Sequence, residues 1–218
     1  MFTEYLFPQI YANKLASAVL SNVLGPQPEL HYIRSNTLLG NTSSRQKVHK
    51  DVRGRHLSHA YAIAMNVCLI DVTPENGSTE LWLGTHNSSP WTDHEAMNLG
   101  FVRGDKLEER RQVRPPVYGS VKKGSLILRD MRMWHAGMPN HTPETRVMLA
   151  LVYMAKWFDN QMKQPFPRSL QPLIESFEKD SDTKIVLDYV DDKLVEDYLS
   201  VEFSTQFQSP HHPTQEVA

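Results

Sequence analysis

The sequence predicts a mainly β fold with helices at both ends of the chain. Segments rich in β-branched and apolar residues fill the middle, polar turn residues separate them, and helical spacing of apolar residues is confined to the termini. The chain contains neither an internal repeat nor a linker-like stretch. We therefore expect residues 1–218 to form a single domain, with a core at about 25–157 and a helical segment at 158–205.

The composition excludes several classes of protein. The 218 residues include 23 Lys and Arg against 25 Asp and Glu, a formal net charge of -2, so no large basic field exists to hold nucleic acid. The longest apolar stretches, such as residues 60–70, are far shorter than the roughly twenty residues that a membrane span needs. The single Cys68 cannot form an internal disulfide, and the N-terminus lacks a secretory pattern. We expect a cytoplasmic protein that binds neither nucleic acid nor a membrane.

The first elements are predicted from the spacing of apolar residues. Residues 2–24 carry apolar side chains at roughly helical spacing, and Gly25-Pro26 ends this predicted helix. Residues 29–35 alternate between apolar and polar, which indicates a strand. Residues 60–72 contain no glycine or proline and are rich in β-branched side chains, which favours a buried strand.

A hairpin and a long polar segment are expected next. Glu75-Asn76-Gly77 is typical of a turn, so residues 79–83 are predicted to return as a strand beside residues 60–72. Residues 87–116 are polar and follow no apolar period, which indicates a solvated excursion.

The remaining elements follow the same patterns. Residues 125–130 and 145–157 predict two further strands, separated by a turn-rich stretch. Residues 169–179 and 191–200 predict two amphipathic helices. Residues 208–218 show no apolar pattern and are expected to form a loose tail.

The segment QKVHKD holds the first candidate metal ligands, His49 and Asp51. Because side chains alternate at period two in an extended segment, both project from the same face, as ligands of one ion must. An HxD triplet is weak evidence by itself, since the chain contains ten histidines. The alternative is a surface salt bridge to Lys47 or Lys50.

The segment SLILRDMRMWHAG supplies a third candidate ligand, His135, directly after a predicted strand. Two imidazoles and one carboxylate on one side of a divalent ion are typical of non-haem Fe(II) oxygenases. Catalytic zinc sites can also use two His and one acid, but the wide separation of Asp51 from His135 lacks the helical spacing of HExxH enzymes.

Arg146 opens the strongly apolar segment RVMLALVY. A buried charge must be paired or carry a large desolvation cost, so this guanidinium needs an anion. Either an acidic side chain from elsewhere in the protein or a ligand carboxylate, held by the planar fork, would satisfy it.

These features in this order resemble the phytanoyl-CoA dioxygenase (PhyH) family of Fe(II)/2-oxoglutarate-dependent dioxygenases, and within it the secondary-metabolism branch. The resemblance covers about residues 25–157 and rests on HxD, the NG turn leading to the tripeptide GTH, the distal His135, and Arg146 eleven residues later. It implies a double-stranded β-helix, a jelly-roll or cupin-like barrel with flanking α-helices, whose strands bring distant ligands together at one open end.

The resemblance also assigns roles to single residues. Arg146 matches the residue that binds the distal carboxylate of 2-oxoglutarate, Gln46 a residue near the keto-acid end, and Thr79 a position whose hydroxyl bonds the cosubstrate. The implied metal ligands, which are also the implied catalytic residues, are His49, Asp51 and His135.

Two further residues recur in the family without being ligands. Asn140 matches an Asn in the turn after the distal His, where we favour the reading that it is a turn former. His86, in GTH, is assigned a supporting or structural role.

The implied reaction is the oxidation of a small organic metabolite by hydroxylation, desaturation or cyclisation, with Fe(II), 2-oxoglutarate and O2. Relatives carry several dozen more residues before the region matching Gly25, so a homodimer or hetero-oligomer that completes the pocket is one expectation, beside an open pocket or a shortened chain. Two alternative functions remain: an auxiliary, non-catalytic subunit of a hetero-oligomeric oxygenase, and a zinc-binding cupin-like protein.

Overall fold

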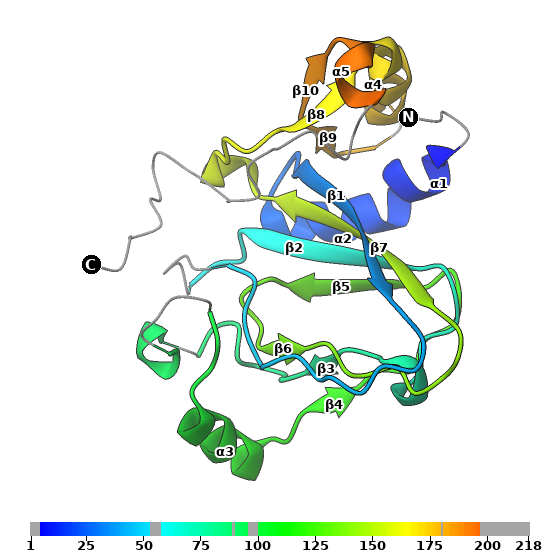
Figure 1. Ribbon diagram of the computed structural model, residues 1–218. Helices are drawn as coiled ribbons and strands as arrows, with labels where there is room; N and C mark the ends of the chain where they lie inside the picture. Colours follow the sequence, from blue (N-terminus) through cyan, green and yellow to red (C-terminus); the bar gives the residue numbers. More distant parts are fainter. Residues whose placement is uncertain (1–4, 53–57, 89, 96–99, 180, 197–218) are drawn as a thin grey trace. The chain divides into compact units, whose positions relative to one another are not determined.

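The computed structural model describes residues 5–52, 58–88, 90–95, 100–179 and 181–196. The chain divides into two compact units (Figure 1). Of the described residues, the first unit comprises 5–33, 151–179 and 181–196, and the second comprises 34–52, 58–88, 90–95 and 100–150. All the candidate site residues lie in the second unit.

The second unit contains two groups of antiparallel strands. Strands β2 (Ala62–Cys68) and β5 (Leu126–Asp130) pair so that Met65 faces Leu128. Strand β3 (Glu80–Leu81) lies between β4 (Val117–Tyr118) and β6 (His135–Ala136). Figure 1 shows the β2 and β5 group running alongside the β3, β4 and β6 group, with helix α3 (Gly104–Val113) next to β4. Two short 3-10 helices, η2 (Pro74–Asn76) and η3 (Trp91–Asp93), complete this unit.

The first unit holds the remaining helices and short strands. Strand β8 pairs in parallel with β10, and β9 pairs in parallel with the start of β1. The elements are α1 (Pro8–Tyr11), α2 (Lys14–Leu24), η4 (Lys156–Phe158), β8 (Gln164–Pro167), η5 (Arg168–Leu170), α4 (Gln171–Lys179), β9 (Lys184–Ile185), β10 (Leu187–Val190) and α5 (Asp192–Glu196).

Two long strands contribute residues to both units: β1 (Glu29–Leu38) and β7 (Arg146–Met154). Strand β7 has β2 and β1 as its hydrogen-bonded neighbours. The prediction of a mainly β protein with outer helices is therefore confirmed. Among the described residues, no helix has the length and apolar character that crossing a membrane requires.

The predicted N-terminal helix and the predicted hairpin both need correction. Two helices replace the single helix over 2–24, because the Asn13 side chain accepts a hydrogen bond from the Ala16 N–H and starts α2 afresh. The hairpin is wrong, because β2 pairs with β5 whereas β3 pairs with β4 and β6. The turn is a 3-10 helix capped by Thr73 and ended by Gly77 at a φ of 87°. This turn therefore leads the chain from the β2 and β5 group to the group of β3, β4 and β6.

The polar segment at 87–116 contains a helix that the sequence reasoning missed. No described side chain of α3 is buried, and its ion pairs join side chains three residues apart, as in Lys106 with Glu109. A helix without an apolar face has no periodic signal, so only its polarity was predictable.

Both helices predicted in the C-terminal part are found over the described residues, as α4 and as α5 (Asp192–Glu196), whereas the strands there were not predicted. Helix α4 confirms the helix predicted at 169–179, but three short strands lie in the segment expected to be helical. Pro165 and Pro167 lie within β8. Because proline argues against a strand, no strand was predicted in this segment. Helix α5 begins at Asp192, and the end of the predicted helix beyond residue 196 and the tail at 208–218 lie outside the described residues.

Candidate metal centre

The backbone brings the two candidate histidine ligands face to face. The N–H of His49 donates to the carbonyl of His135, and the N–H of His135 donates to the carbonyl of His49, each at 2.9 Å. Residues directly opposite in an antiparallel pair project to the same side, and the two ring centroids are 4.3 Å apart. Asp51 lies two residues beyond His49, and its N–H donates to the Met131 carbonyl at 3.1 Å. All three side chains therefore share one side of the backbone.

The three ligand atoms converge on one point. Asp51 Oδ1 lies 3.6 Å from His49 Nε2 and 3.4 Å from His135 Nε2, and the ligand atoms of the group all lie within 4.8 Å of one another. Two nitrogens and one carboxylate oxygen at these separations can bind one divalent ion. This donor set, bound from one side, suits Fe(II) with open positions.

The other nitrogen of each ring faces a backbone carbonyl. His49 Nδ1 lies 2.9 Å from the Lys47 oxygen, and His135 Nδ1 lies 3.1 Å from the Met133 oxygen. When each Nδ1–H donates to its carbonyl, each Nε2 keeps its lone pair toward Asp51, which is the tautomer that metal binding needs.

The opposite side of the same segments is apolar core. The side chains that alternate with the ligands pack together in a cluster within the second unit. This packing holds the ligand-bearing segments extended and leaves the ligands on the other side. The cluster consists of Val48, Trp82, Val102, Trp134 and Ala136.

Asp51 is ionised by its neighbours. Burial acts to raise its pKa, but the charge of Arg129 and the contacts with His135 and His49 outweigh it and hold the pKa well below the usual range. Arg129 Nη2 donates to Asp51 Oδ2 at 2.6 Å, while Oδ1 faces the two imidazoles. The two oxygens of this carboxylate thus have separate partners.

The two imidazoles differ in their protonation. Burial acts to lower the pKa of His49, but its hydrogen bonds to Asp51 and to the Lys47 carbonyl outweigh burial, so its pKa is raised. Burial, followed by the charge of Arg129, lowers the pKa of His135. His135 is therefore the more readily neutral of the two rings.

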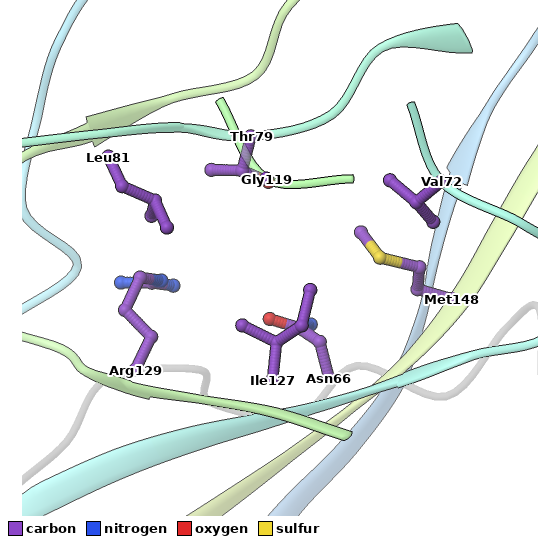
Figure 2. A pocket seen from close by; sticks show the side chains of 8 residues that line it. All are labelled: Asn66, Val72, Thr79, Leu81, Gly119, Ile127, Arg129 and Met148. Atoms are coloured by element: carbon purple, nitrogen blue, oxygen red, sulfur yellow. The ribbon is translucent and has the colours of Figure 1, made fainter. Parts of the chain in front are cut away.

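A small cavity lies between the two groups of strands of the second unit (Figure 2). Strands β2, β5 and β7 supply one side, and β3 with neighbouring loops supplies the other. Figure 2 shows Arg129 and Leu81 at one end and Val72 with Met148 at the other. The lining residues are Asn66, Val72, Thr79, Leu81, Gly119, Ile127, Arg129 and Met148.

Arg146 is a buried cation with few partners. The residue is 3% exposed, and its Nε and Nη1 atoms have no hydrogen-bond partner among the described residues. Nη2 donates to Asn36 Oδ1 at 3.4 Å, and burial lowers the pKa of the guanidinium. Arg146 lies two residues before Met148 on the same face of β7, and Met148 lines the cavity. In the part of the chain that the structure describes, the predicted need of Arg146 for an anion is not met by an acidic side chain.

The other predicted residues occupy different positions. Thr79 lines the cavity. Gln46 pairs with Gly137, since its Oε1 accepts from the Gly137 N–H and its own N–H donates to the Gly137 carbonyl, both at 2.9 Å. Asn140 is fully buried and closes its own turn through Thr142 and Glu144, as a turn former does. His86 Nδ1 is buried without a partner in the described chain.

The sequence reasoning missed Arg129. It lies in the apolar strand β5, in the segment SLILRD, and its side chain is 10% exposed. The argument that singled out Arg146, a charge within an apolar strand, could have found it.

The fold and this donor set define a jelly-roll protein of the cupin type with a candidate non-haem metal centre. A family model described as phytanoyl-CoA dioxygenase (PhyH) matches residues 3–148. The chain therefore belongs to the PhyH family, as its motifs indicated.

Known relatives agree with this assignment. The ectoine dioxygenase of Sphingopyxis alaskensis is 28% identical over an alignment of 177 residues, and the match covers 72% of this chain and 57% of that protein. The crystal structure of EctD from S. alaskensis with 2-oxoglutarate and 5-hydroxyectoine is 26% identical with a TM-score of 0.54, and the match covers 64% of this chain and 48% of that one. This chain thus spans about half the length of these relatives.

A third likeness concerns the fold alone. SnoN, a non-heme alpha ketoglutarate dependent epimerase from nogalamycin biosynthesis, is 21% identical with a TM-score of 0.53, covering 67% of this chain and 55% of that one. The predicted double-stranded β-helix class is confirmed by these likenesses, although the described strands do not close into a barrel.

Proposed function

We propose that this chain is an Fe(II)/2-oxoglutarate-dependent oxygenase that oxidises a small organic metabolite in secondary-metabolite biosynthesis. One observation carries the proposal: three metal-ligand side chains converge in the same unit as a buried arginine, Arg146, that lacks an acidic partner among the described residues. The three ligand side chains suit a divalent metal, and the buried arginine suits a carboxylate. The cosubstrate 2-oxoglutarate, a dicarboxylate, could therefore bind both the metal and Arg146.

His49, Asp51 and His135 would hold the iron. The bound iron supplies the activation of O2, coupled to the oxidation of 2-oxoglutarate to succinate and CO2. For a hydroxylation, one oxygen atom of O2 enters succinate and the other enters the substrate; desaturation or cyclisation are the other outcomes.

The protein residues bind and orient the reactants. Arg146 binds the distal carboxylate of 2-oxoglutarate through its planar fork, which also satisfies its buried nitrogens. The Thr79 hydroxyl, in the cavity lining, donates to the cosubstrate, and Gln46 lies near its keto-acid end in this proposal. The apolar side chains of Val72, Ile127 and Met148 exclude water from the distal end.

The family and its solved members support this proposal. The family description names a dioxygenase, and the EctD structure contains 2-oxoglutarate. A single oxygenase domain over residues 1–218, a pocket completed by a homodimer or hetero-oligomer, and a cytoplasmic location remain predictions of the same hypothesis.

The test combines metal binding with turnover. Anaerobic addition of Fe(II) and then 2-oxoglutarate should produce the weak visible charge-transfer band of the iron chelate, and aerobic turnover with a panel of small metabolites should release succinate. His135→Ala should lose both signals. A protein that binds zinc but gives no band with Fe(II) and 2-oxoglutarate would instead support the zinc-binding alternative.

A further inference from the structure

Arg129 is the arginine among the residues that line the cavity, and the proposed reaction has not used it. Its guanidinium lines the cavity, and Figure 2 shows its nitrogens pointing into the cavity opposite Thr79 and Leu81. It donates through Nη2 to Asp51 Oδ2 at 2.6 Å, and Nη1 lies 3.3 Å from His135 Nδ1. Arg129 is therefore the cavity residue that adjoins the metal ligands.

The charges around the cavity leave room for an anion beside Arg129. In the metal-free chain the negative charge of Asp51 balances Arg129. A divalent ion on the ligands adds two positive charges, and the other lining residues, from Asn66 to Met148, are all neutral. Arg146 adds a further buried cation. Because unpaired buried charge is costly, the loaded site has about three positive charges to balance, and a dicarboxylate would supply two of the negative charges.

Arg129 can hold two anions at once. A guanidinium has five N–H donors in a rigid plane, and one of its terminal nitrogens bonds Asp51. A metal bound to Asp51 Oδ1 withdraws charge from that carboxylate and weakens its hold on Arg129. The remaining donors then face the cavity, on the side of the metal ligands.

Arg146 is not among the residues that line the cavity, but it lies on the strand that supplies the end opposite Arg129. Figure 2 shows Met148 across the cavity from Arg129, and Arg146 lies two residues before Met148 on the same face of β7. Ile127 lies between the two ends, and Val72 lies with Met148 at the far end, so the end opposite Arg129 is apolar (Figure 2). A cation near each end and hydrocarbon between them are complementary to a short aliphatic dicarboxylate.

We propose that Arg129 is a specificity-determining residue that binds the carboxylate next to the keto group of the cosubstrate, so that the cavity recognises a dicarboxylate at both ends. This inference rests on the proposed function and deepens it. The two arginines then have different roles: Arg129 binds the carboxylate near the metal, and Arg146 binds the distal carboxylate.

Three ligands that differ in one carboxylate test this division. The protein is saturated with Ni(II), and calorimetry gives the dissociation constants of 2-oxoglutarate, 2-oxopentanoate, which lacks the distal carboxylate, and 4-oxopentanoate, which lacks the carboxylate beside the keto group. Metal content is measured for every variant, so that a loss of metal is not mistaken for a loss of ligand affinity.

Arg129→Gln should weaken 2-oxoglutarate and 2-oxopentanoate by about tenfold or more, the equivalent of one lost charge-assisted hydrogen bond, and change 4-oxopentanoate by less than about twofold. Arg146→Gln should weaken 2-oxoglutarate and 4-oxopentanoate and spare 2-oxopentanoate. Arg129→Lys keeps the charge but loses the planar guanidinium fork, so it should weaken the same two ligands by a smaller factor. If the Gln variant does not fold, this Lys variant provides the test.

Arg103→Gln is the matched control, since Arg103 is exposed and pairs with Asp105. It should leave all three constants unchanged. Arg129 variants that bind metal less tightly but, when saturated, bind 2-oxoglutarate like the wild type would overturn the inference and leave the proposed function standing. A wild-type protein that binds no 2-oxoglutarate when saturated with metal would overturn both.

Discussion

Arg132 and Arg146 are buried to nearly the same degree, at 5% and 3% exposed, yet they differ in their partners. Arg132 donates from Nε and Nη2 to the Asp130 carboxylate at 2.9 and 2.6 Å. Arg146 has two nitrogens without a partner in the described chain, and its third bonds Asn36 at 3.4 Å. Burial therefore does not distinguish an arginine with an acidic partner from one without such a partner among the described residues, whereas hydrogen-bond satisfaction does.

The difference arises from the local chain. Asp130 lies two residues before Arg132 in the turn that follows β5, so the acid and the base reach each other within the turn. Arg146 opens β7, where its apolar neighbours offer no acid. The anion for Arg146 must therefore come from outside its own strand.

The largest expected effect is the loss of the acid partner of Arg132. Asp130→Ala should lower the free energy of unfolding by about 3–5 kcal/mol, since it leaves a buried guanidinium without its carboxylate. Urea denaturation measures this change. Asp105→Ala, which breaks the exposed pair with Arg103, should cost far less, because an exposed ion pair contributes little to stability. Equal losses in the two variants would break the comparison.

Metal binding should stabilise the protein independently of Arg146. A divalent ion at about 100 times its dissociation constant should raise the free energy of unfolding by about 2.7 kcal/mol, because it binds only the folded ligand group. Denaturation with and without Ni(II) measures the gain. Arg146→Met should keep this gain and His135→Gln should lose it. A gain that survives in His135→Gln would place the metal elsewhere.

Replacement of Arg146 should separate stability from ligand binding. Arg146→Met removes a buried charge with unsatisfied donors and should raise the free energy of unfolding of the ligand-free protein by about 1–3 kcal/mol, while 2-oxoglutarate binding is lost. Arg132→Met should instead destabilise, because it leaves the Asp130 carboxylate without its partner. Denaturation curves of both variants decide the point, and a destabilised Arg146→Met would show that this arginine is structural.

The smallest expected effect concerns a buried histidine outside the metal group. Burial, followed by the charge of Lys50, lowers the pKa of His94 to about 4, and its Nδ1 lies 3.0 Å from the Gly100 carbonyl. The unfolded chain, with a pKa of about 6.5, binds this proton more readily, so stability should fall as the pH drops from about 6.5 toward 4. His94→Asn keeps a donor for Gly100 and should give a shallower slope in denaturation measured across this window. An unchanged slope would show that His94 takes up its proton over the same pH range in the folded and the unfolded chain.

Several features of the site followed from simple rules about the sequence. Strand alternation predicted that His49 and Asp51 share a face, and the structure has both beside His135. The cost of burying a charge predicted that Arg146 needs an anion, and two of its nitrogens are indeed without a partner in the described chain. These inferences depend on one strand at a time, so periodicity sufficed.

Other features depended on which strand lies beside which. The NG turn was read as a hairpin because local turn signals do not reveal the sheet that receives the next strand. Helix α3 lacks an apolar face, so its sequence shows no helical period from which it could be predicted. Arg129, like Arg146, is a charged residue within an apolar strand. Its place beside the metal ligands became clear only from its contact with Asp51, which lies 78 residues away in the chain.

The sequence by itself determined the mainly β class, the chemical types of the candidate ligands and the need of a buried cation for an anion, since these depend on residue chemistry and on a period of two. Only the tertiary structure decided that His49 and His135 bond across one bridge, that the two oxygens of Asp51 have separate partners, and that a cavity lies between two groups of strands. Pairing between distant strands is set by the packing of the whole unit, and no local pattern encodes it.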